Sequence, residues 1–190
     1  MAEDFLGDRK RALEEEFFRK QERSILERMR AEQATQTARQ ALSQASGLQD
    51  AAVLDRLIGL GMQTDTLVAM GLVPLVAVAW ADGALDEKER RAIVSALDTA
   101  GITLHSPAGQ LIQSWLASAP PASLLEAWKA YIAALCTQLS AADRISLRDS
   151  VLDRARAVAA AAGGFLGLGA KTSKAEEEML RTLEGTFVRE

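Results

Sequence analysis

Residue types that carry most enzyme chemistry are scarce in this chain. It has one histidine and one cysteine among 190 residues, and aromatic residues make up only 5 % of the sequence. A single cysteine excludes an intrachain disulfide framework, which favours a reducing compartment. Catalytic or metal-binding histidines usually have companions, so we expect His105 to be a loop residue and Cys136 a buried, inert thiol.

Long apolar runs and clustered positive charge are also missing. The most apolar stretch, residues 67–81, is shorter than the ~18 residues that a membrane helix needs, and it contains Pro74. The net charge of −4 argues against a nucleic-acid-binding surface, which requires a basic patch. The N-terminus mixes acids and bases and lacks the apolar core of a signal peptide. We therefore expect a cytoplasmic protein with no transmembrane segment and no nucleic-acid partner.

The residues that are abundant favour helices. Alanine and leucine dominate, no segment sustains a two-residue alternation, and each apolar stretch has helical spacing or length. The composition changes after Ser46, where a charged segment gives way to apolar sequence. The sequence thus predicts an all-α fold with two parts, a long charged amphipathic helix over residues 1–45 and a helical domain over residues 46–190.

The N-terminal part carries nine acidic and nine basic residues, and no Gly or Pro interrupts residues 8–46. Large apolar residues recur along it at steps of 7, 4, 8 and 4: Leu6, Leu13, Phe17, Ile25 and Met29. This spacing predicts a helix over at least residues 5–30 with one narrow apolar stripe. Such a helix buries little surface alone, so it must lie on the domain, pair with another copy or bind a partner.

Capping and breaking residues divide the remainder into helices. One apolar helix over 66–80 is expected to be kinked at Gly71 and Pro74. The other predicted helices cover residues 50–60, residues 87–99, two segments set off by Pro107 and by Pro120-Pro121, residues 141–162, and the residues that follow Ser173.

An acidic corner joins the 66–80 helix to the next one. It reads Ala81-Asp82-Gly83-Ala84-Leu85-Asp86-Glu87-Lys88-Glu89, with four carboxylates within eight residues. Carboxylate oxygens are the ligands that Ca²⁺ and Mg²⁺ prefer, so Asp82, Asp86, Glu87 and Glu89 are candidate ligands for a divalent cation. The alternative is structural: Asp86-x-x-Glu89 is a capping-box pattern, and acids complement a helix N-terminus. Both interpretations stay open at this point.

A second segment resembles the first. Residues 158–164 read VAAAAGG and precede the capping-box pattern Ser173-x-x-Glu176, much as residues 78–83 precede Asp86-x-x-Glu89. A degenerate internal duplication of helix, corner and capped helix would explain the likeness. The second copy has Gly163 where the first has Asp82.

The second corner is rich in glycine, and its Gly164–Thr172 segment superficially resembles a phosphate-binding loop. In that loop a lysine directly follows the second glycine and a strand precedes it. Here Ala170 intervenes and a helix is predicted before the glycines. We expect instead that the apolar residues between Gly163 and Gly169 pack on the core or form a binding patch.

The first corner and its weaker copy resemble the helix-corner-helix signature of the TerB-like family, named for the tellurite-resistance protein TerB and including DnaJ-like N-terminal domains. The likeness rests on Ala81-Asp82-Gly83, Leu85-Asp86 and Glu89, with support from residues 163–176. It implies an all-helical domain of two halves over about residues 50–190. It also implies metal binding through the corner acids, as in some members, or attachment to stress-response or chaperone systems. Gly163 departs from the pattern, which speaks against a paired two-corner metal site.

These observations predict a non-catalytic, partner-binding or ion-sensing module, in a stress-response or envelope-associated system. A protein partner or self-association is expected, a membrane-associated complex is compatible with this role, and a divalent cation is the only candidate cofactor. Two alternatives remain. One is a metal-dependent enzyme that uses Asp82, Asp86 and Glu89. The other is a structural protein that oligomerises through its N-terminal helix.

Overall fold

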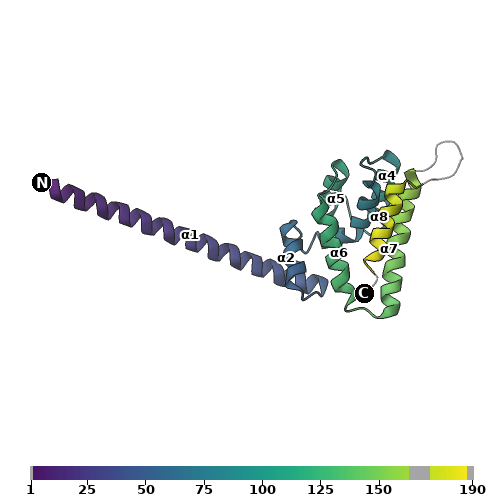
Figure 1. The fold of residues 1–190 in the computed structure, drawn as a ribbon, viewed down its shortest axis with the longest axis horizontal. Coiled ribbons are helices and arrows are strands. Elements are labelled where there is room, and N and C mark those ends of the chain that lie inside the picture. The colour runs from purple at the N-terminus through teal and green to yellow at the C-terminus, as the bar shows by residue number, and fades with distance from the viewer. Residues whose placement is uncertain (1, 163–171, 188–190) are drawn as a thin grey trace. The chain divides into compact units, whose positions relative to one another are not determined.

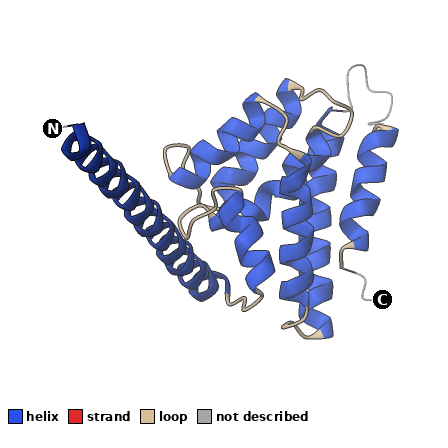
Figure 2. Cartoon of the chain, turned by 60° about the vertical axis from the view of Figure 1, so that its left-hand side comes forward, coloured by secondary structure: helices blue, strands red, loops and turns tan. Residues whose placement is uncertain are grey.

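The computed structural model describes residues 2–162 and 172–187, with side chains from residue 16 onward. Every regular element in these ranges is a helix, which confirms the all-α prediction (Figures 1 and 2). No helix in the described ranges is both long and apolar enough to cross a membrane. The elements, in order, are α1 (Ala2–Ser46), α2 (Ala51–Gly59), the 3₁₀ helix η1 (Leu67–Leu72), α3 (Val73–Ala79), α4 (Glu87–Thr99), α5 (Pro107–Ala117), α6 (Ala122–Cys136), α7 (Ala141–Ala162) and α8 (Lys174–Gly185).

The chain divides into two compact units, residues 1–40 and residues 41–190. The division lies a few residues before the predicted boundary at 45/46, because the last turn of α1 belongs to the domain. Leu42 in that turn is only 1 % exposed and joins the hydrophobic core. The Ser43 hydroxyl donates a hydrogen bond to the carbonyl oxygen of Leu48 (2.6 Å), across the turn that ends α1.

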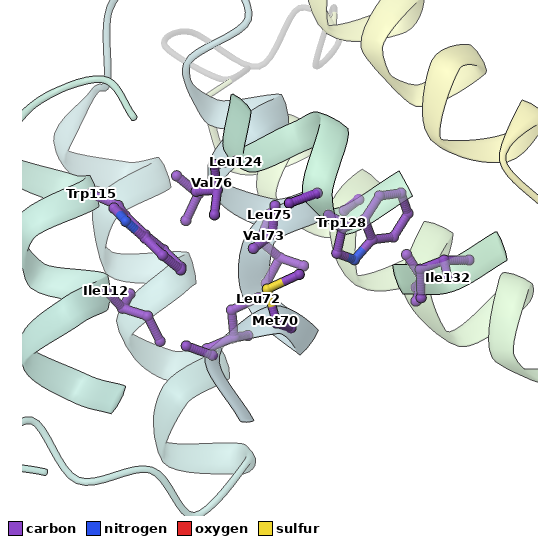
Figure 3. Packing of buried hydrophobic residues seen from close by; sticks show 14 of the residues in the cluster. Met70, Leu72, Val73, Leu75, Val76, Ile112, Trp115, Leu124, Trp128 and Ile132 are labelled. Carbon is purple, nitrogen blue, oxygen red and sulfur yellow. The ribbon is translucent and has the colours of Figure 1, made fainter. Parts of the chain in front are cut away.

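The short helix α3 is the centre of the domain, and it packs against η1, α4, α6, α7 and α8. Its side chains are buried almost all round, as expected for a helix without a polar face (Figure 3). Trp128 of α6 is 1 % exposed and meets the Phe187 ring edge to face, with 6.1 Å between ring centroids. Cys136 is buried, as predicted.

The prediction of a single kinked helix over residues 66–80 is wrong. The chain forms a 3₁₀ turn over Leu67–Leu72 and then starts a new α-helix at Val73. Pro74 lies in the first turn of α3. The N–H groups of a first turn make no intrahelical hydrogen bond, so a proline costs none there, and its fixed φ suits the helix. The proline therefore opens a helix instead of bending one.

Helix ends that were predicted from capping residues and glycines are confirmed elsewhere in the domain. Asp50 caps α2, and Gly61 beyond its end has φ of +75°. Gly101, with φ of +69°, follows the end of α4 in the same way. Glycine is favoured at these positions because it adopts a left-handed backbone without a steric penalty.

Candidate functional site

The acidic corner between α3 and α4 is built by the backbone as much as by side chains. Trp80 ends α3, and Gly83 turns the chain with φ of +91°. Asp82 stabilises this turn, because its Oδ1 accepts a hydrogen bond from the backbone N–H of Ala84 (3.0 Å). One carboxylate oxygen of Asp82 is thus committed to the turn.

Asp86 and Glu89 form a complete capping box at the start of α4. Oδ1 of Asp86 accepts hydrogen bonds from the N–H groups of Lys88 (2.7 Å) and Glu89 (2.8 Å). In return, Oε2 of Glu89 accepts one from the N–H of Asp86 (2.9 Å). The exposed Glu87 carboxylate instead faces Arg90, with 3.4 Å between Oε1 and Nε. The structural interpretation of the corner therefore accounts for contacts of all four acids.

Two long side chains tie the corner to the end of α5. The Trp80 indole N–H donates to the carbonyl oxygen of Trp115 (2.8 Å), and Arg90 Nη2 donates to that of Leu116 (2.9 Å). The last carbonyls of a helix have no intrahelical donor, so these contacts satisfy groups that would otherwise need water. They also fix the position of the corner on the domain.

A second capping box opens α8. Ser173 Oγ accepts a hydrogen bond from the N–H of Glu176 (3.1 Å), and Glu176 Oε2 accepts one from the N–H of Ser173. Glu176 and its counterpart Glu89 are each only 4 % exposed. Glutamates are rarely buried unless they are paired. Each of these two glutamates is therefore expected to have a partner.

The two buried glutamates interact with each other. The pKa of Glu89 is raised to about 7, chiefly by burial. The hydrogen bond from the N–H of Asp86 opposes this shift, and the charges of Asp86 and Glu176 and a hydrogen bond to Glu176 contribute to it. Oε1 of Glu176 is buried, and no N–H or hydroxyl group of the described residues donates a hydrogen bond to it. A proton on Glu89 would give this oxygen a donor. Glu89 therefore keeps its proton up to near neutral pH, in a buried position beside Glu176.

The candidate metal ligands do not converge. Among the described residues, no three His, Cys, Asp or Glu side chains form a group that could hold a metal ion. The predicted set also missed Glu176, the residue that does meet Glu89. The repeated capping-box pattern marked Glu89 and Glu176 as similar residues, but it did not show that they meet. Metal binding by Asp82, Asp86, Glu87 and Glu89 remains a prediction.

The second candidate site is the apolar side of α1, considered by itself. Five large apolar side chains in its described part are each more than half exposed: Phe17 (58 %), Phe18 (61 %), Ile25 (55 %), Leu26 (52 %) and Met29 (59 %). The predicted stripe also included Leu6 and Leu13, whose side chains lie outside the described part. With 3.6 residues per turn, Phe18, Ile25 and Met29 lie on one side of the helix, with Phe17 and Leu26 to either side of them. Such a group of exposed apolar side chains is a mark of an interaction surface.

The glycine-rich corner between Gly163 and Gly169, which we considered as a binding patch, lies outside the described residues. The chain matches no protein-family model, no curated protein and no solved structure. The likeness to TerB-like domains therefore stays a prediction that rests on the corner residues alone.

If capping is the main role of the corner, Asp86→Ala should be the more damaging of two matched substitutions. Asp86 accepts two backbone N–H groups and is the N-cap, so we expect its loss to lower the free energy of unfolding by about 1–2 kcal/mol. Asp82 accepts one exposed N–H, and Asp82→Ala should cost roughly 0.5 kcal/mol. Urea denaturation of both variants gives the comparison. An equal or larger loss from Asp82→Ala would contradict the capping interpretation.

Proposed function

We propose that this protein is a non-catalytic, partner-binding helical module in which α1 supplies the binding surface. The observation that supports this is the set of five large apolar side chains that α1 exposes between residues 17 and 29. Exposing them to water is unfavourable by roughly 25 cal/mol for each Å² of apolar surface. A partner that covers them recovers this energy, and a helix face is a common recognition surface.

Variants of α1 test this proposal directly. Phe18→Ser combined with Ile25→Ser removes two side chains from the apolar side, and we expect it to abolish retention of the proteins that the full chain captures from lysate of its source organism. The matched control, Lys20→Ser with Glu27→Ser, changes two exposed residues on the opposite side of the helix and leaves the net charge unchanged. Quantitative mass spectrometry of the captured proteins provides the measurement. Equal capture by both variants would contradict the proposal.

Ion sensing at the acidic corner is a second candidate function, and the Glu89–Glu176 pair favours it. The charges of Asp86 and Glu176 raise the pKa of the buried Glu89, so a cation beside these groups would be attracted to them. In the predicted form of the site, Asp82, Asp86, Glu87 and Glu89 supply oxygen ligands to a divalent cation. The likeness to TerB-like domains supports the same function, in a stress-response or envelope-associated setting.

A thermal-shift experiment tests ion sensing. A cation at about 100 times its dissociation constant adds roughly 2.7 kcal/mol of stability, which for a chain of this size raises the melting temperature by roughly 5–10 °C. We expect such a rise with one of Ca²⁺, Mg²⁺, Mn²⁺ or Zn²⁺, reversed by chelator and lost in Asp82→Ala. Unchanged melting with all four ions would leave the corner purely structural.

A further inference from the structure

We propose that a pocket at the start of α7 binds a carboxylate group attached to a small apolar body. The pocket has a volume of about 200 Å³ and is lined by two arginines and three apolar residues: Arg144, Arg148, Ala141, Ile145 and Phe187. Phe187 follows the end of α8, which packs beside α7 (Figure 1). We call this site the arginine pocket. It belongs to the domain over residues 41–190 and is separate from the binding surface proposed for α1.

Arg144 carries a positive charge that the described part of the protein does not compensate. Its Nε is buried and donates no hydrogen bond to any group in that part of the chain. No carboxylate of the described residues forms an ion pair with this side chain either. A buried donor of a charged group is costly without a partner, because it has lost its hydration and gained no hydrogen bond in return. An anion in the arginine pocket would supply that partner.

Arg148 lies one helical turn further along α7, on the same side as Arg144. Two like charges at this spacing repel each other unless an anion lies between them. Arg148 is already paired, because its Nε and Nη2 donate to Oδ1 of Asp149 at 3.0 and 2.8 Å. Asp143 does not line the pocket, and it accepts a hydrogen bond from the Ser140 hydroxyl (2.6 Å). The uncompensated charge is thus that of one arginine, which suits a carboxylate better than a dianion.

The rest of the pocket lining is apolar. Phe187 is buried and is held in place by Trp128, whose ring it meets edge to face. Ile145 is 52 % exposed, so apolar surface at the pocket is in contact with water. A ligand with an aromatic or aliphatic body would cover this surface while its carboxylate met the guanidinium groups. The pocket is smaller than the roughly 300 Å³ that drug-sized ligands need, so the apolar body must be small.

Four probes separate charge from apolar contact on the full-length chain. Phenylacetate has both, phenylacetamide has the same shape without the charge, and acetate and inorganic phosphate have charge without the apolar body. We expect phenylacetate to bind with a dissociation constant of roughly 0.1–1 mM, at least about tenfold more tightly than the other three. Two-dimensional ¹H–¹⁵N NMR gives the affinities and also detects arginine Nε–H groups. The Nε–H signal that Arg144→Gln removes should shift when phenylacetate binds.

A further pair of probes distinguishes a free acid from the end of a protein. A short peptide that ends in phenylalanine is tested with a free C-terminal carboxylate and as its amide. If the free-acid peptide binds at least as tightly as phenylacetate and the amide does not, the pocket takes protein C-termini. If the free-acid peptide binds more weakly than phenylacetate, the pocket takes a small organic acid. Both results support recognition of a carboxylate with an apolar body.

Matched variants locate the binding. Arg144→Gln removes the uncompensated charge and should weaken phenylacetate binding at least about tenfold. Arg156→Gln makes the same change in the same helix, but its side chain lies outside the pocket and pairs with Asp153, so binding should be unchanged. Ile145→Ser removes apolar surface at the pocket and should weaken binding severalfold. Circular dichroism checks that each variant keeps its helix content.

Several results would overturn the inference. These are equal binding of phenylacetate and phenylacetamide, equal binding of phenylacetate and either small anion, or equal effects of Arg144→Gln and Arg156→Gln. No binding of phenylacetate up to about 20 mM would do the same. So would binding that appears only after residues 188–190 are deleted, because the end of the chain itself would then compete for the pocket. Capture of proteins through α1 is tested separately, so failure here leaves the proposed function standing.

Discussion

Gly109→Ala is expected to destabilise the domain by roughly 2–4 kcal/mol, a large effect for the addition of one methyl group. A Cβ atom at this position would overlap the carbonyl oxygen of Thr103 and lie 2.8 Å from the Cα of Leu104. Both are backbone atoms, so no side-chain rotation can relieve the clash. Helix α5 must move away from the segment before it, or that segment must rearrange.

A displacement of α5 should also affect the acidic corner. The end of α5 accepts the hydrogen bonds of Trp80 and Arg90, so a displaced α5 should weaken both contacts. We therefore expect Gly109→Ala to lower the denaturation midpoint and to change tryptophan fluorescence of the folded state, since Trp80 and Trp115 meet there.

Gly59→Ala is the matched control. Gly59 is also helical, but no atom lies within 4 Å of the position that an added methyl group would occupy, and alanine has the higher helix propensity. This variant should be as stable as the wild type or slightly more stable. Unfolding of both glycine variants at the same denaturant concentration would contradict the prediction that an added methyl group clashes at Gly109.

The features that the sequence predicted are local ones. The capping boxes at Asp86-x-x-Glu89 and Ser173-x-x-Glu176 depend on residues three positions apart, and both form as expected. The bounds of α7 were predicted for the same reason, because its ends are marked by nearby residues. The helix over residues 5–30 was predicted because no Gly or Pro interrupts residues 8–46.

The features that were missed depend on tertiary structure. Whether Pro74 bends a helix or begins one is decided by how the preceding segment packs, and here that segment forms a 3₁₀ turn. The meeting of Glu89 and Glu176 joins residues from helices far apart in the chain. Each glutamate was recognised as part of a cap, but no local pattern shows that a capping side chain will be buried against a second one.

The Glu89–Glu176 pair gives a second large prediction, which concerns pH. The pKa of Glu89 is about 7 in the folded protein, against 4.5 for an ordinary glutamate. Between these values the folded state binds more protons than the unfolded state, so stability falls as pH rises. The contribution is fully present below about pH 4.5 and is lost as pH passes through about 7. A shift of this size corresponds to roughly 3 kcal/mol.

Glu89→Gln separates this effect from other carboxyl groups. Glutamine keeps an oxygen that can accept the N–H of Asp86, and its amide can donate to Glu176 at every pH, as a protonated Glu89 does. The variant should match the wild type near pH 5 and exceed it by about 1–3 kcal/mol near pH 8. Urea denaturation at intervals across this range measures the difference. Glu178→Gln, on the exposed side of α8, serves as control and should follow the wild-type curve.

The sign of the result distinguishes two descriptions of the pair. If burial beside Asp86 and Glu176 raises the pKa of Glu89 to about 7, ionising Glu89 is costly, and glutamine relieves that cost at high pH. If Glu89 is instead ionised in the folded protein and is stabilised by the helix N-terminus and the N–H of Asp86, glutamine removes a favourable charge at the start of α4. Glu89→Gln would then be less stable than the wild type near pH 8, and the gap would narrow as pH falls. A wild-type curve that is flat from pH 5 to pH 8 would likewise rule out the raised pKa of Glu89.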